Sequence, residues 1–175
     1  MIYLFEDINR FSDDNYYKFC SLLSNDRKKR IDNYHFIADK KLSLIVYLLL
    51  LIGLELDYGI CEKQEFGFGR LKKPFLKNHS HIQFNFSHCI KSAACAINTT
   101  SVGVDVQDYI TWDEDLINMV CSSGEKELAN TQENLFTRYW VLKESYLKFK
   151  GIGLIKNLAS LDFSDCKGQN FTKYG

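Results

Sequence analysis

The apolar run LSLIVYLLLLIGL, at residues 42–54, constrains the fold of this chain more strongly than any other segment. Its 13 residues are too few to cross a bilayer as a helix, which takes about 20 apolar residues. Because the run is apolar on every side, we expect a buried helix that ends at Gly53. A chain of 175 residues can build one such core or two small domains that share an interface.

Charge and cysteine content argue against several classes of protein. The 22 basic and 22 acidic residues give a formal net charge of zero, whereas a dedicated nucleic-acid binder usually carries a basic excess. The six cysteines form no CxxC pair and no zinc-ligand spacing, so we expect reduced thiols. The N-terminal MIYLFEDINR lacks the basic start of a signal peptide. We therefore expect a cytoplasmic protein without nucleic-acid or membrane partners.

Hydrophobic periodicity and capping residues predict an α+β chain. Strands are predicted at 1–6, 82–87, 91–99, 101–107 and 158–164. Helices are predicted at 12–23, 24–54 (a short basic helix running into the buried one), 111–120, 122–131 and 134–150. The glycines of FGFGR at 66–70 predict a loop.

A faint internal repeat appears when the chain is shifted on itself by roughly 100 positions. LLIGL then falls on KGIGL, and each half reads as a strand, two capped helices and a long helix that ends in Ile-Gly-Leu. Shared amphipathic composition is the alternative explanation. A duplication would divide the chain into halves 1–100 and 101–175. The first half continues for 44 residues (55–98) to finish its strands, but only 21 residues (155–175) remain in the second, so we expect a truncated or reduced second sheet.

Two segments place polar side chains at strand positions. Asp105 interrupts the apolar strand VGVDVQ, and burying an unpaired carboxylate is costly unless a metal, a cation or hydrogen bonds compensate it. Ser87 and His88 end the alternating strand in FNFSHC, which is typical of ligand contacts, although a structural His–Ser pair is equally compatible.

The helix at 134–150 presents Trp140, Glu144 and Lys148 on one stripe, because they recur every four residues. A solvated Glu–Lys pair beside a core tryptophan is the simplest interpretation. A carboxylate from a strand and another from a helix can also share Mg²⁺, with lysine and histidine on the substrate phosphates.

The order of these segments resembles the 4'-phosphopantetheinyl transferases, in particular the larger Sfp-type branch. The resemblance runs through nearly the whole chain and rests on SNDRKKRIDNYHF (24–36), LKKP (71–74), FNFSHC (84–89), VGVDVQ (102–107), WVLKESYLK (140–148) and GIGL (151–154).

The resemblance implies two similar α/β halves related by a pseudo-two-fold axis, each a small, mainly antiparallel sheet packed on a long helix, in a monomer that binds coenzyme A between its halves. It implies Mg²⁺-dependent transfer of the 4'-phosphopantetheine arm of coenzyme A to a serine of an apo acyl or peptidyl carrier protein, with release of 3',5'-ADP. Such carriers serve polyketide, nonribosomal peptide and fatty acid biosynthesis.

The resemblance also assigns roles to single residues. Asp105 and Glu144 would hold Mg²⁺, Glu144 would in addition be the base for the serine proton, and Lys148 would offset charge on the phosphates. Further contacts to coenzyme A would come from Lys73, Ser87 and His88, and weaker candidates for its 3'-phosphate are Arg27, Arg30 and Lys41. A solvated basic helix face is the alternative for these last three.

Three departures from the family pattern keep a second class open. Gln107 stands where most Sfp-type members carry a third acid, so it would ligate Mg²⁺ through its amide oxygen or through a water. Lys72 replaces the glycine before Lys-Pro, and the C-terminal sheet is short. A degenerate homologue that binds coenzyme A or a carrier protein without transferring the arm is therefore the main alternative. An unrelated coenzyme A-binding enzyme is the third.

Overall fold

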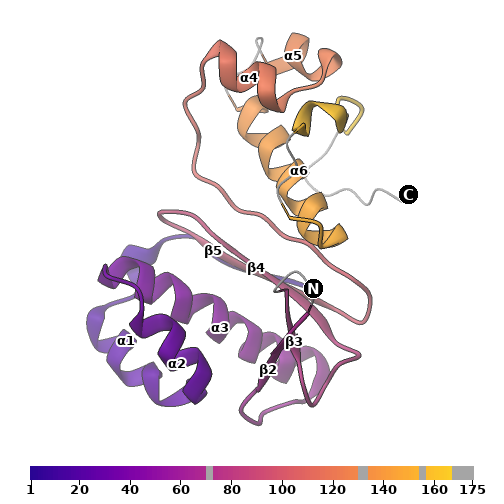
Figure 1. The fold of residues 1–175 in the computed structure, drawn as a ribbon. Helices are drawn as coiled ribbons and strands as arrows, with labels where there is room; N and C mark the ends of the chain where they lie inside the picture. Colours follow the sequence, from indigo (N-terminus) through magenta and orange to yellow (C-terminus); the bar gives the residue numbers. More distant parts are fainter. Residues whose placement is uncertain (70–72, 130–133, 154–156, 167–175) are drawn as a thin grey trace.

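The computed structural model describes residues 1–69, 73–129, 134–153 and 157–166 (Figure 1). Within them the fold is α+β, with small antiparallel sheets and six α-helices. The first part contains β1 (Ile2–Phe5), α1 (Asp13–Phe19), α2 (Asn25–Asp32), α3 (Ile37–Tyr58), β2 (Phe66–Phe68), β3 (Pro74–Leu76), β4 (Gln83–His88) and β5 (Ala93–Asn98). The second contains α4 (Glu114–Val120), α5 (Ser123–Ala129) and α6 (Leu135–Lys150). Short 3-10 helices lie at Ile8–Arg10, Cys20–Leu22 and Leu158–Ser160.

The buried helix predicted from the apolar run is α3, which packs on one face of the main sheet (Figure 1). The predicted end at Gly53 is wrong, because α3 continues to Tyr58 and closes on Gly59 in the left-handed conformation, with φ of 69°. Gly53 has a packing role instead. A Cβ there would overlap the side chains of Tyr3 and Ile97, so the missing side chain lets the helix approach the sheet closely.

The main sheet has the strand order β1-β5-β4, and both pairings are antiparallel. The strands predicted at 1–6, 82–87 and 91–99 are thereby confirmed. One face carries large apolar residues such as Phe84 and Ile97, which join the core around α3. The predicted loop at 66–70 is partly wrong, since β2 pairs with β3 in a second, two-stranded sheet.

On the opposite face of the main sheet, β4 and β5 present small and polar side chains. Asn85 and Ser87 of β4 alternate with the larger residues, and they pair in register with Ala96 and Ala94 of β5. Val104 packs on these two alanines, so the extended segment 101–107 crosses this face of the sheet. Figure 1 shows this segment running between the sheet and α6.

Both strands predicted beyond residue 100 are wrong. Residues 101–107 are not a strand, and two of their backbone N–H groups donate to side chains of β4. Residues 158–164 form a 3-10 turn and bends, with Leu158 and Phe163 buried against α6. No strand is assigned in the described parts of 101–166. Lys72, Leu154 and residues 167–175, which belong to the predicted motifs and tail, lie outside the described residues.

A separate hydrophobic cluster surrounds α6, and it includes Phe136, Leu147 and Phe163. Two short helices, α4 and α5, precede the long helix α6, just as α1 and α2 precede the long helix α3. No helix in the described part of the chain combines the length and apolar character needed to span a membrane. None of the six cysteines is in a disulfide.

Candidate active site

The polar site lies where β4, the extended segment 101–107 and α6 meet. Gly103 brings the segment into backbone contact with α6, because a Cβ at this position would overlap the Ser145 carbonyl oxygen and the backbone of Phe149. This close approach places Asp105, two residues further on, beside Glu144 and Lys148. The structure therefore brings together the two carboxylates and the lysine that the sequence singled out.

Asp105 is held by one of its two carboxylate oxygens. Its Oδ1 accepts hydrogen bonds from Ser87 Oγ at 2.7 Å and from Lys148 Nζ at 2.5 Å. Ser87 Oγ in turn accepts from Lys148 Nζ at 3.0 Å and from the Val106 N–H at 3.3 Å. The ion-pair partner of Lys148 is therefore Asp105, 43 residues away, rather than Glu144 one turn earlier on the same helix. The simple helix-surface pair is not what these residues form.

Each of the two carboxylates has one buried oxygen that lacks a partner. Asp105 Oδ2 and Glu144 Oε1 are both buried without a hydrogen bond. Burial, and secondly the charge of Asp105, raises the pKa of Glu144, while Lys148 partly offsets this rise. Two buried acceptors without donors at this point leave the site incomplete. Carboxylate oxygens are the ligands that Mg²⁺ prefers, so this donor set fits the ion.

The described residues contain no cluster of three or more His, Cys, Asp or Glu side chains suited to a metal. A Mg²⁺ ion here would have two carboxylates from the protein and would take its other ligands from water and substrate, as is usual for this ion. Gln107, the predicted third ligand, is exposed to solvent.

A cavity of about 580 Å³ opens next to this site. It is lined in part by cationic and aromatic side chains from α2, β2 and β4, including Arg27, Lys29, Arg30, Phe66, Phe68 and His88. His88 ends β4 one residue after Ser87, so its side chain lies on the opposite face of the strand from the Ser87 hydroxyl. Partial burial, the largest cause, and the nearby Lys148, Arg27 and Arg30 lower the pKa of His88, against the opposing charge of Asp39.

Arg27 is a buried cation in the wall of this cavity. Its Nη2 donates to the Ser43 carbonyl at 2.6 Å and to Ser43 Oγ at 3.0 Å, and its Nε is buried without a partner. Burial lowers its pKa to about 10, which leaves it charged at neutral pH. Among the described residues it joins no salt bridge. An unpaired buried guanidinium beside a cavity favours an anionic ligand.

Two predicted coenzyme A contacts occupy other places. Lys41 pairs with Asp13 at 2.5 Å and does not line the cavity. Lys73 Nζ donates to the carbonyls of Val102 at 3.2 Å and Lys148 at 3.1 Å, so it ties the extended segment to the end of α6. Burial lowers the pKa of Lys73. Trp140 packs against Phe136 in the core around α6, which confirms the core tryptophan of the simplest interpretation.

A buried ion pair joins α6 to α5, and no motif of the sequence predicted it. Lys143 and Glu125 are completely buried and lie 2.5 Å apart. The available signal was position: Lys143 falls on the apolar stripe of the helix, between Tyr139 and Leu147, where a lysine needs a buried partner. Asn85, whose side chain accepts a hydrogen bond from the Val104 N–H, was missed as well.

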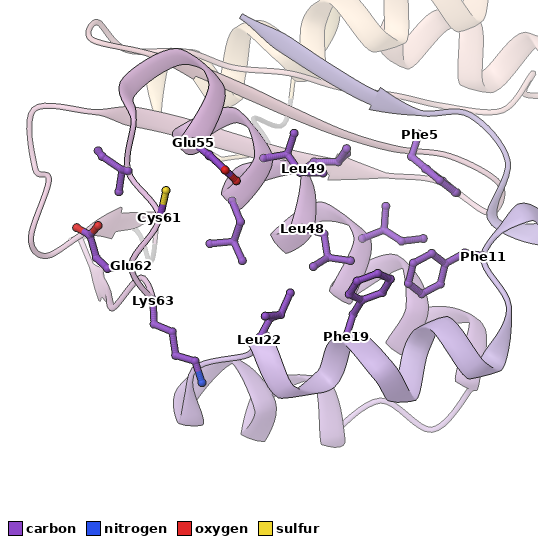
Figure 2. Close-up of a pocket in the computed structure, with 14 residues that line it drawn as sticks. Phe5, Phe11, Phe19, Leu22, Leu48, Leu49, Glu55, Cys61, Glu62 and Lys63 are labelled. Atoms are coloured by element: carbon purple, nitrogen blue, oxygen red, sulfur yellow. The ribbon is translucent and has the colours of Figure 1, made fainter.

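A second cavity, of about 430 Å³, lies between α3 and the helical turns near the N-terminus (Figure 2). Its lining is mainly apolar, with Phe11 and Phe19 at one end and Glu55, Glu62 and Lys63 at the other. It shares no lining residue with the basic cavity beside the carboxylates.

Comparison with known proteins identifies the family. The model of the 4'-phosphopantetheinyl transferase superfamily matches residues 101–174. The L-aminoadipate-semialdehyde dehydrogenase-phosphopantetheinyl transferase of Candida glabrata is 31% identical over 139 residues, which cover 72% of this chain and 54% of that protein. The 4'-phosphopantetheinyl transferase gsp of Aneurinibacillus migulanus is 26% identical over 145 residues, covering 77% and 58%.

The 4'-phosphopantetheinyl transferase Sfp of Bacillus subtilis is 23% identical over 144 residues, which cover 78% of this chain and 64% of that protein. The chain thus spans little more than half the length of the curated relatives it matches. The family match includes the extended segment and α6, which supply both carboxylates and Lys148. The chain belongs to the 4'-phosphopantetheinyl transferase superfamily.

Proposed function

We propose that this protein transfers the 4'-phosphopantetheine arm of coenzyme A to a serine of an apo acyl or peptidyl carrier protein and releases 3',5'-ADP. The observation that carries the proposal is the pair of buried carboxylate oxygens without partners, Asp105 Oδ2 and Glu144 Oε1, close to a basic cavity whose lining includes Asn85, the acceptor for the Val104 N–H. The names of the curated relatives support the same reaction.

Coenzyme A would bind with its phosphates toward the cationic wall of the cavity. Arg27 and Arg30 lie on α2, and both are close enough to His88 to lower its pKa. The volume of about 580 Å³ is in the range of small-molecule sites, roughly 300–1,000 Å³. The Phe66 and Phe68 side chains offer apolar surface to the rest of the molecule.

Asp105 Oδ2 and Glu144 Oε1 are the oxygens that would hold Mg²⁺, with exposed Gln107 reaching it directly or through a water. When bound, the ion supplies positive charge to the pyrophosphate. Two protein carboxylates leave part of the neutralising charge to the substrate, so we expect Mg²⁺ to bind weakly to the free protein and more tightly with coenzyme A.

In the reaction, the serine oxygen of the carrier forms a bond to the phosphorus that bears the pantetheine arm. The bond from that phosphorus to the oxygen leading to 3',5'-ADP breaks. Glu144 takes the serine proton, directly or through a water, and its raised pKa brings it closer to the range of an effective base. Lys148 offsets the charge on the phosphates, and the geometry around Ser87 keeps it beside Asp105 before substrate binds.

The proposal includes an arrangement in two halves, 1–100 and 101–175, related by a pseudo-two-fold axis with coenzyme A between them. The repeated order of three helices and the two separate hydrophobic clusters support it. The first half supplies the basic cavity, and the second supplies Asp105, Glu144 and Lys148. We expect a cytoplasmic monomer that contacts its carrier protein only transiently.

A degenerate homologue is the second candidate, favoured by Gln107 in place of an acid and by the absence of a strand from the described parts of 101–166. Such a protein would bind coenzyme A or a carrier without transferring the arm.

One assay separates the two. The protein is incubated with coenzyme A, Mg²⁺ and an apo carrier protein, and the carrier is weighed by mass spectrometry. A carrier whose acceptor serine is replaced by alanine, and a reaction with a chelator, are the controls. A gain of one phosphopantetheine on the intact carrier alone supports the transferase. Calorimetric binding of coenzyme A without any mass gain supports the degenerate homologue.

A further inference from the structure

Side chains of β4 take the place of a strand partner for the segment that carries Asp105. The Val104 N–H donates to Asn85 Oδ1 at 3.0 Å, and the Val106 N–H donates to Ser87 Oγ at 3.3 Å. Asn85 and Ser87 lie two residues apart on one face of β4, and they match two amides that are also two residues apart. The register of the segment is therefore set by side-chain acceptors.

Asn85 and Ser87 differ in what else they do. Ser87 also donates to Asp105 and accepts from Lys148, so its replacement would disturb the carboxylate itself. Among the residues that the structure describes, the side chain of Asn85 accepts one hydrogen bond, from the Val104 N–H. Val104 is buried on the alanines of β5, and Gly103 next to it touches α6. Asn85 thus holds the segment one residue before Asp105.

We propose that Asn85 is a positioning residue that fixes Asp105 for divalent-cation binding. The inference rests on the proposed function for the identity of the ion. Groups that orient a metal ligand without touching the metal change its affinity by about 10–100-fold when they are removed. Asn85 also lines the basic cavity, so a direct contact to coenzyme A is the competing role.

The test compares Asn85→Leu with Gln83→Leu. Gln83 is the matched control, because it is an amide on the same strand and the same face, and its side chain donates to the Ser80 carbonyl instead of the segment. Amide hydrogen exchange at Val104 and Mn²⁺ binding followed by electron paramagnetic resonance, with coenzyme A present, need neither carrier protein nor turnover.

Asn85→Leu should speed exchange at Val104 by roughly 3–10-fold, the loss expected for one hydrogen bond, and weaken Mn²⁺ binding about tenfold. Gln83→Leu should change neither, and Asn85→Asp, which keeps the acceptor, should restore slow exchange. Weaker coenzyme A binding with unchanged Val104 exchange would overturn the proposal in favour of direct contact. Equal Mn²⁺ affinity of wild type and Asn85→Leu would overturn it too, as would no Mn²⁺ binding at all.

Failure of the proposed function would look different. If Asn85→Leu behaves as expected in both measurements while the wild-type protein leaves the carrier mass unchanged, Asn85 positions a cation site in a protein that does not transfer the arm. If the wild-type protein modifies the carrier but the variant exchanges at Val104 like the control, the transferase stands and the role of Asn85 is refuted.

Discussion

Two lysines of α6, Lys143 and Lys148, form ion pairs that differ in whether the surrounding polar groups all have hydrogen-bond partners. Lys143 is wholly buried, and its Nζ donates to Glu125 Oε2 at 2.5 Å, the Val120 carbonyl at 2.6 Å and the Leu158 carbonyl at 3.1 Å. These three acceptors use all three donors of an ammonium group. Glu125 is satisfied as well, since it accepts from the backbone N–H of residues 122 and 163 at 2.8 Å each.

Lys148 and Asp105 form the open counterpart of that pair. The Lys148 side chain is 28% exposed, and next to it Asp105 Oδ2 and Glu144 Oε1 remain without donors. A buried network with every group satisfied fixes the packing of the helices around it. A network of the same residue types with acceptors left over is instead suited to binding. The difference separates a structural ion pair from a functional one on the same helix.

The largest effect is expected at the open site. Asp105→Ala and Glu144→Ala should each reduce transfer by at least ~10³-fold, because each removes a carboxylate that neutralises charge around the phosphates. Turnover is measured with saturating Mg²⁺ and coenzyme A, and circular dichroism checks that both variants are folded. Near-wild-type turnover of either variant would show that the site is assigned to the wrong residues.

The closed pair should control stability. Lys143→Met leaves Glu125 buried without its counter-charge, and breaking a buried pair in this way costs about 3–5 kcal/mol. The free energy of unfolding is measured in denaturant by tryptophan fluorescence, since Trp112 and Trp140 both lie in this core. Lys150→Met, at an exposed position of the same helix, is the control and should cost less than about 1 kcal/mol. Similar losses of unfolding free energy in the two variants would show that the Lys143–Glu125 pair has no special role in stability.

His88 lines the basic cavity and is close enough to the open site for Lys148 to lower its pKa. His88→Ala should weaken coenzyme A binding by roughly 1.5–3 kcal/mol, the cost of one charge-assisted hydrogen bond, with a smaller effect on turnover at saturation. Calorimetry gives the affinity, and the carrier mass assay gives the turnover. Unchanged affinity with collapsed turnover would instead make His88 a catalytic residue.

The smallest effect concerns pH. Because the pKa of Glu144 is raised above its usual 4.5, the folded protein binds this proton more tightly than the unfolded chain. Stability contributed by this group is therefore full at low pH and falls as pH rises from 4.5 through the raised pKa. Glu144→Gln should remove this loss and stabilise the protein at neutral pH, by less than about 1 kcal/mol because solvent screens a partly exposed group. Thermal unfolding across pH gives the result, and a variant that melts lower than wild type at neutral pH would contradict it.

Hydrophobic periodicity predicted the elements whose burial follows from the pattern of their own side chains. The apolar run became α3, and the stripe of Trp140, Glu144 and Lys148 became one side of α6. The order of the motifs along the chain predicted that Asp105 lies in the same site as Glu144 and Lys148. The end of α3 was missed because Gly53 reflects contact with the sheet rather than a helix terminus.

Other features depend on tertiary contacts that no local pattern contains. Residues 101–107 alternate like a strand, yet the recorded acceptors of Val104 and Val106 are side chains of β4. The partner of Lys143 lies 18 residues earlier in the chain, on a different helix. Lys41 carries the positive charge that a phosphate contact needs, but its position on α3 places it beside Asp13, with which it pairs.

The close contact between Gly103 and α6 determines how far apart Asp105 and Glu144 lie. Two backbones meet there without an intervening side chain, and each is also fixed elsewhere, the segment by β4 and the helix by its own core. Even one methyl group at this point would act as a wedge and increase the distance between Asp105 and Glu144. The missing side chain of Gly103 thus sets the spacing of the two carboxylates, and this spacing limits how large an ion they can hold between them.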